Sequence, residues 1–71
     1  MKQINLIKSE AIFLNGLRFN LTEDATKWLE KHNVSDYLLI NRQLYDRLGP
    51  FIVFGDDVPE ECINRFTLRW L

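Results

Sequence analysis

Two consecutive turn residues, Asn15 and Gly16, separate two apolar runs and restrict how the N-terminal part of the chain can fold. A type I′ turn needs positive φ at both central residues, and Asn-Gly is the pair best suited to it. Apolar and polar residues alternate over 17–21, as in a strand with one buried face. The sequence therefore predicts a β-hairpin over residues 11–21, with an earlier strand over residues 3–7.

The segment after the hairpin carries the signals of an amphipathic helix. Thr22 is a suitable N-cap, and the two residues that follow it are acidic, as the helix dipole favours. An apolar stripe then has the spacing i, i+3, i+4 and i+7, formed by Ala25, Trp28, Leu29 and His32. Asn33 is a suitable C-terminal cap, so we expect the helix to end there.

Residues 35–49 allow two interpretations. In the first, one helix is capped by Ser35 and runs through the whole segment. In the second, residues 37–40 form a short strand, and Asn41 caps a brief helix over residues 42–48. We favour the second interpretation because four successive apolar residues fit a strand that is buried on both faces.

The C-terminal part is expected to contain a short helix and a last strand. Asp57 and Glu60 are three residues apart, and Pro59 lies within the expected first turn, which resembles a capping box. A short helix through Asn64 would follow. Residues 66–71 alternate with a period of two, which favours a strand.

The length of 71 residues allows one domain. With a central strand over residues 51–54, the elements follow in the order β-β-β-α-β-α-β-α-β. We therefore predict a small single α+β domain over residues 1–71, with an N-terminal β-hairpin or meander and a mixed sheet with two or three short helices.

A chain of this size has few means of stabilisation beyond its core. Cys62 is the only cysteine, so no disulfide can form within the chain. A structural zinc site needs four ligands, and His32 and Cys62 are the only soft or borderline ones. That leaves good packing or self-association, for example as a homodimer. A single cysteine, no export signal and no long apolar run together predict a cytoplasmic protein that does not span a membrane.

The side chains that carry chemistry in other proteins do not form a recognisable site here. His32 and Cys62 could pair as a catalytic dyad, but no third residue is identifiable that would orient them. Both fit structural roles on apolar faces. We therefore predict no catalytic residue, no metal, no cofactor and no enzymatic activity.

Two groups of residues are candidate binding surfaces. The first is an acidic docking patch for a basic partner, formed by Asp56, Asp57, Glu60 and Glu61. The second is a partner interface on the expected last strand, formed by Phe66, Leu68, Arg69 and Trp70. Trp70 is the candidate anchor, and the alternative is that its ring simply closes the core.

These observations favour binding over catalysis. Nine basic and ten acidic residues give a net charge of −1, which is far from the basic balance of a nucleic-acid binder. We expect a small accessory protein that binds another protein as an inhibitor or regulator, a kind of chain common in phages and mobile elements. The alternative is a small nucleic-acid-binding regulator that uses lysine and arginine on one face. A small enzyme or ligand-binding protein is the third and least favoured class.

Overall fold

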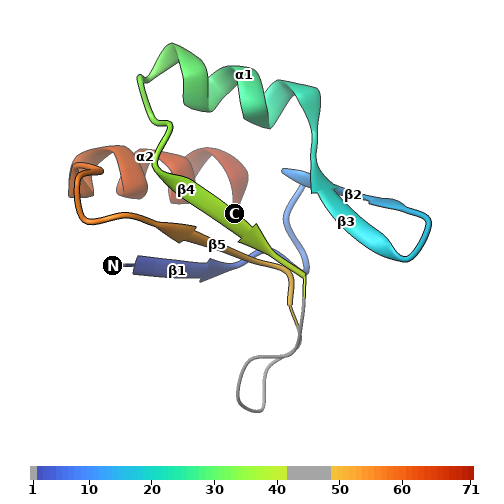
Figure 1. Cartoon of the computed structure of the whole chain (residues 1–71). Helices are drawn as coiled ribbons and strands as arrows, with labels where there is room; N and C mark the ends of the chain where they lie inside the picture. Colours follow the sequence, from blue (N-terminus) through green and yellow to red (C-terminus); the bar gives the residue numbers. More distant parts are fainter. Residues whose placement is uncertain (1, 42–48) are drawn as a thin grey trace.

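The computed structural model describes residues 2–41 and 49–71. This part of the chain contains five strands and two helices (Figure 1). In chain order they are β1 (Lys2–Asn5), β2 (Ile12–Asn15), β3 (Arg18–Leu21), α1 (Glu23–Lys31), β4 (Tyr37–Ile40), β5 (Phe51–Phe54) and α2 (Glu60–Trp70). The predicted α+β class is confirmed. The strand predicted over 37–40 is confirmed, which excludes the single long helix, and the brief helix predicted over 42–48 lies outside the described residues.

The described strands form two separate antiparallel sheets. One has the strand order β1-β5-β4, and the other consists of β2 and β3. The sequence predicted a mixed sheet and allowed an N-terminal meander, but β1 pairs with β5 rather than with the hairpin. Residues 41–50, between β4 and β5, are fewer than the dozen or so that a parallel crossover needs, so these neighbours pair antiparallel.

The hairpin forms where it was predicted, but its turn lies one residue later. Asn15 pairs with Arg18, so the two central residues are Gly16 and Leu17 rather than Asn15 and Gly16. Gly16 has a φ of 66°, and neither Asn15 nor Leu17 has a positive φ. Positive φ at the first central residue alone is the pattern of a type II′ turn, so the predicted type I′ turn is wrong.

Helix α1 has the predicted N-cap Thr22, and it ends with the C-cap His32, one residue before the predicted cap Asn33. The Thr22 side chain accepts a hydrogen bond from the amide of Ala25 over 3.1 Å. At the other end Asn33 has a φ of 59°, the left-handed conformation that ends many helices. Ala25 and Leu29 from the predicted stripe are buried, which fixes the face that α1 turns toward the core.

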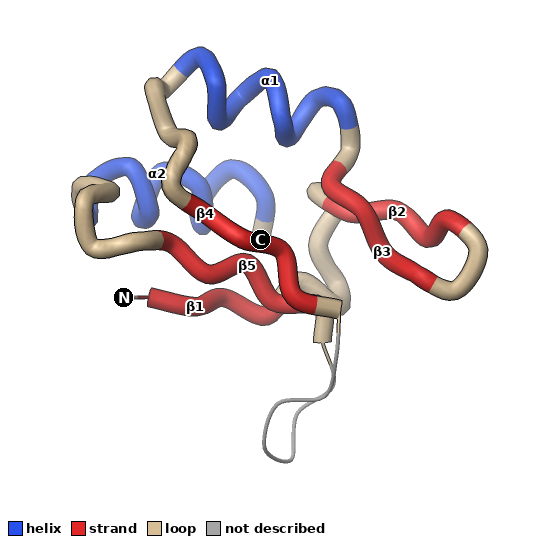
Figure 2. Tube along the Cα trace, viewed as in Figure 1, coloured by secondary structure: helices blue, strands red, loops and turns tan. Residues whose placement is uncertain are grey.

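The core lies between the helices and one face of the three-stranded sheet (Figure 2). Ile52 and Phe54 of β5 point toward it and are fully buried. The ring of Phe54 meets Phe66 of α2 edge-on with 5.4 Å between centroids, and Trp28 of α1 meets Phe66 in the same manner at 5.8 Å. Aromatic contacts at these distances contribute about 0.5–1.5 kcal/mol each beyond the area they bury.

Helix α2 replaces both the short helix and the last strand that the sequence predicted. It runs from Glu60 to Trp70 and buries Ile63, Phe66 and Trp70, which have helical spacing. Its N-cap is Pro59, which makes no side-chain capping bond, so the capping box predicted for Asp57 and Glu60 is wrong.

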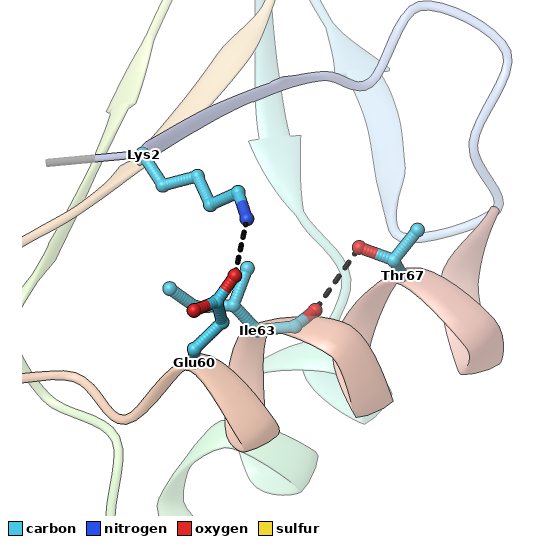
Figure 3. A network of polar contacts seen from close by, with 4 residues as sticks. All are labelled: Lys2, Glu60, Ile63 and Thr67. Carbon is cyan, nitrogen blue, oxygen red and sulfur yellow. Dashed lines mark hydrogen bonds and ion pairs between the residues drawn. The ribbon is translucent and has the colours of Figure 1, made fainter.

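The helix is favoured over the strand because it buries Ile63 together with Phe66 and Trp70 and leaves Leu68 in solvent. One hydrogen bond within the helix and one contact with β1 support it. The Thr67 hydroxyl donates to the Ile63 carbonyl over 3.0 Å, and Lys2 of β1 contacts Glu60 over 3.1 Å (Figure 3).

Candidate protein-binding surface

Helix α2 buries two residues of the predicted C-terminal interface and exposes the other two. Phe66 is completely buried and Trp70 is 6% exposed, whereas Leu68 is 86% exposed. Arg69 is also exposed, and its guanidinium carbon lies 4.0 Å from the centre of the Trp70 ring. Phe66, Leu68 and Trp70 therefore do not share a strand face, and Trp70 closes the core as the alternative interpretation had it. Leu68 and Arg69 alone remain accessible to a partner.

The four residues of the predicted acidic patch are all exposed, but ion pairs engage two of them. Glu60 contacts Lys2, and Glu61 contacts Arg65 over 2.6 Å. The pKa of Asp56 lies below its ordinary value, because a hydrogen bond and the charge of the N-terminal amino group favour its carboxylate form. Intramolecular cations thus offset part of the negative charge, which weakens the patch as a docking site for a basic partner.

His32 and Cys62 occupy structural positions. The His32 ring stacks on Trp28 with 3.9 Å between centroids, and its Nδ1 lies 2.9 Å from the Trp28 carbonyl oxygen. Cys62 is half-buried against the core from α2. In residues 2–41 and 49–71, no hydrogen bond joins the two side chains, and no three His, Cys, Asp or Glu side chains gather in a metal-binding arrangement.

The strongest candidate surface lies on the hairpin, which the sequence did not single out for binding. Phe13, Leu14 and Leu17 are 46%, 62% and 100% exposed, and we call them the hairpin tip. Only the other end of the hairpin, at Ile12 and Leu21, packs against the core. Figure 1 shows β2 and β3 projecting from the rest of the molecule. Three large apolar side chains within five residues therefore face solvent on a protruding element.

The side chain of Asn41 fixes the position of the hairpin. Its Oδ1 accepts a hydrogen bond from the Phe19 amide over 2.7 Å, and its Nδ2 donates to the Phe19 carbonyl over 2.8 Å. These are the two bonds that a neighbouring strand would make, so Asn41 occupies the outer edge of β3. The sequence suggested Asn41 as a helix cap and gave no signal for this long-range contact. An isolated two-stranded hairpin is marginally stable, and this contact holds it in place.

A second apolar surface lies on the face of the three-stranded sheet opposite the helices. Strand alternation and the β4–β5 register place Leu38, Ile40, Phe51 and Val53 on that face. None of the four belongs to the main core cluster of the described residues, but only Leu38 is exposed, at 69%, and Phe51 is buried at 3%. The sequence predicted burial of residues 37–40 on both faces, and the described helices cover only one face of this sheet.

Comparisons with known proteins identify no relative. No family model, no curated protein and no solved structure matches this chain. The two described helices are both too short to cross a lipid bilayer. Functional inference therefore rests on the surfaces of the molecule itself.

Proposed function

We propose that this chain is a small accessory protein that binds another protein, as an inhibitor or regulator, through the hairpin tip. The observation that supports this proposal is the exposure of Phe13, Leu14 and Leu17 on a protruding hairpin. Exposed apolar groups on one element favour a protein contact, because burying them in a partner removes them from water. The lone Cys62 fits the reducing cytosol, where we expect this binding to take place.

The charges of the molecule favour a protein partner over nucleic acid. Lys2, Lys27 and Arg65 each contact a carboxylate within the chain, at 3.1, 3.1 and 2.6 Å. Arg18 is the single basic residue on β2 and β3. A nucleic-acid surface needs several unpaired cations on one face, whereas one arginine beside apolar side chains is typical of protein interfaces.

Affinity capture with a pair of matched variants tests the proposal. Leu17→Lys places a charge on the hairpin tip, and Leu68→Lys places the same charge on α2, where Leu68 is 86% exposed. Both variants are expected to fold, as far-UV circular dichroism can establish. Immobilised wild type and Leu68→Lys should retain the same protein from a lysate of the source cells. Leu17→Lys should retain at least about tenfold less of it, since an interface hot spot contributes 2 kcal/mol or more.

Two results would contradict the proposal. One is equal retention of the partner by both variants, which would place the contact elsewhere on the molecule. The other is retention of nucleic acid that is lost at higher salt and leaves no protein bound after nuclease treatment, which would support the alternative function.

A further inference from the structure

We propose that the hairpin of one chain pairs with the hairpin of a second copy, edge to edge through β2, to form a four-stranded antiparallel sheet across a two-fold axis. This inference deepens the proposed function, because it names one protein partner of the hairpin. It begins with the directions of the backbone groups on β2 and β3.

The contact between Asn41 and Phe19 fixes those directions. Both backbone groups of Phe19 bond to the Asn41 side chain and therefore point away from β2. Leu14 lies opposite Phe19, so these two residues form a pair that is not hydrogen-bonded to each other. The N–H and C=O of Leu14 consequently point away from β3, toward the outer edge of β2. Ile12, two residues earlier, presents its backbone groups in the same direction.

Within residues 2–41 and 49–71, no strand pairs with the outer edge of β2. Its strand neighbour there is β3 alone (Figure 2). The β1 edge of the larger sheet and the outer edge of β3 differ from it, whereas the β4 edge (Tyr37–Ile40) also carries no charge and no proline. β1 carries Lys2, an edge charge that opposes strand addition, and Asn41 occupies the outer edge of β3. β2 consists of Ile12, Phe13, Leu14 and Asn15 and has neither a charge nor a proline. It thus lacks the features that usually protect an edge strand.

The sequence of β2 fits a second copy of itself. In an antiparallel pair centred on Phe13, Leu14 of each chain faces Ile12 of the other, and both residues direct backbone groups toward the new neighbour. The same apolar residues then meet on both sides of the axis, as an isologous contact requires. No charge on either β2 opposes the approach. The half-exposed Phe13 and the 62% exposed Leu14 would both lose solvent contact in this arrangement.

The interface is small, so the dimer should depend on concentration. A strand of four residues extends only about 13 Å, at about 3.3 Å per residue. Contacts of that size bury less surface than a stable obligate dimer does. We therefore expect exchange between monomer and dimer in the micromolar range, with a weight-average mass that rises from 8.5 kDa toward twice that value.

Site-directed cross-linking tests the register of this pairing. In a Cys62→Ser parent, Phe13→Cys places one thiol from each chain at the two-fold axis. Opposed residues of a pair that is not hydrogen-bonded have Cα atoms about 4.5 Å apart, which lies within the range for a disulfide. Leu17→Cys, in the exposed turn, is the matched control. In a glutathione redox buffer, Phe13→Cys should form a covalent dimer at least about tenfold faster than Leu17→Cys, because association raises the effective thiol concentration.

Sedimentation of chains without a new cysteine gives an independent readout. Wild type should show the concentration-dependent rise in mass, and Leu14→Lys should stay at 8.5 kDa, since it places charges beside the symmetric contact. A wild-type chain that remains monomeric to about 1 mM, or equal cross-linking rates of the two cysteine variants, would overturn self-pairing. The capture experiment with Leu17→Lys tests the proposed function separately from the dimer. A monomeric chain that still binds a partner through the hairpin tip would overturn the dimer and leave the proposed function standing.

Discussion

Gly16 occupies a backbone conformation that other residues adopt at a cost. Its φ of 66° places it in the region that L-amino acids with a side chain rarely enter. A Cβ atom added at Gly16 would meet no atom within 4 Å, so the obstacle to a larger residue is its own backbone and not its surroundings. Gly55 is the opposite case, because a Cβ there would meet the carboxylate of the exposed residue Asp36.

This contrast leads to a prediction for the two glycines. Gly16→Val should lower the free energy of unfolding by more than about 1 kcal/mol, because a β-branched residue resists positive φ. Gly55→Ala should cost less, since the Asp36 side chain can rotate away into solvent. Urea denaturation followed by tryptophan fluorescence measures both. A midpoint for Gly16→Val equal to that of wild type would show that the turn does not depend on this conformation.

Local signals at single residues were predictable from the sequence, and long-range ones were not. Thr22 and Asn33 bond within their own turn of chain, so the N-cap of α1 was identified correctly and the helix end was placed within one residue of the C-cap His32. Asn41 bonds to Phe19, 22 residues away, and nothing in the neighbouring sequence indicates that contact. Trp70 shows the same limit, because its burial depends on the path of the whole of α2. Its indole Nε1–H is buried without a hydrogen-bond acceptor among the described residues.

At the scale of elements, the strands over 37–40 and 51–54 were predictable because short runs of apolar residues leave few alternatives. Residues 66–71 were not, since Phe66, Leu68 and Trp70 fit a period of two, while Ile63, Phe66 and Trp70 fit a helix equally well. Six residues are too few for periodicity to decide, and packing against β5 decides instead. The predicted strand is wrong for this reason, and Phe66, Leu68 and Trp70 do not point the same way.

Substitution of Leu68 distinguishes the helix from the strand in solution. Leu68 is 86% exposed on α2, so Leu68→Ala should change the free energy of unfolding by less than about 0.5 kcal/mol. In a strand that turned Leu68 toward the core, the same change would cost about 2–5 kcal/mol. Phe66→Ala is the control, and its expected cost is about 3–5 kcal/mol because Phe66 is fully buried. A large loss in the Leu68 variant would contradict the helical assignment.

At the scale of the whole molecule, the apolar side chains exceed what one small core can hold. Residues 2–41 and 49–71 leave seven large apolar side chains exposed, including Phe13, Leu17 and Leu38. Such a surplus fits the composition, since 46% of a 71-residue chain is hydrophobic. The composition does not give the location, because the exposed positions depend on the path of every strand and helix. Three of the seven lie on the hairpin tip, one on β4 and two at Leu68 and Leu71 of the C-terminal end, whereas Trp70 is buried.

Self-association through β2 would bury part of this exposed apolar surface and make the stability of the fold depend on chain concentration. Any process that binds the folded chain and not the unfolded one raises the melting temperature with concentration. For a dimer, each tenfold increase in chain concentration above the dissociation constant adds about 0.7 kcal/mol per chain, half of the 1.4 kcal/mol for a tenfold change in an equilibrium constant. In a domain of this size that should raise Tm by about 3–6 °C.

Differential scanning calorimetry at 20 and 200 μM should therefore show the shift for wild type and not for Leu14→Lys, whose exposed position leaves the core intact. A Tm that is independent of concentration in both proteins would show that the core alone stabilises the fold, and that the apolar hairpin tip is available to a different partner.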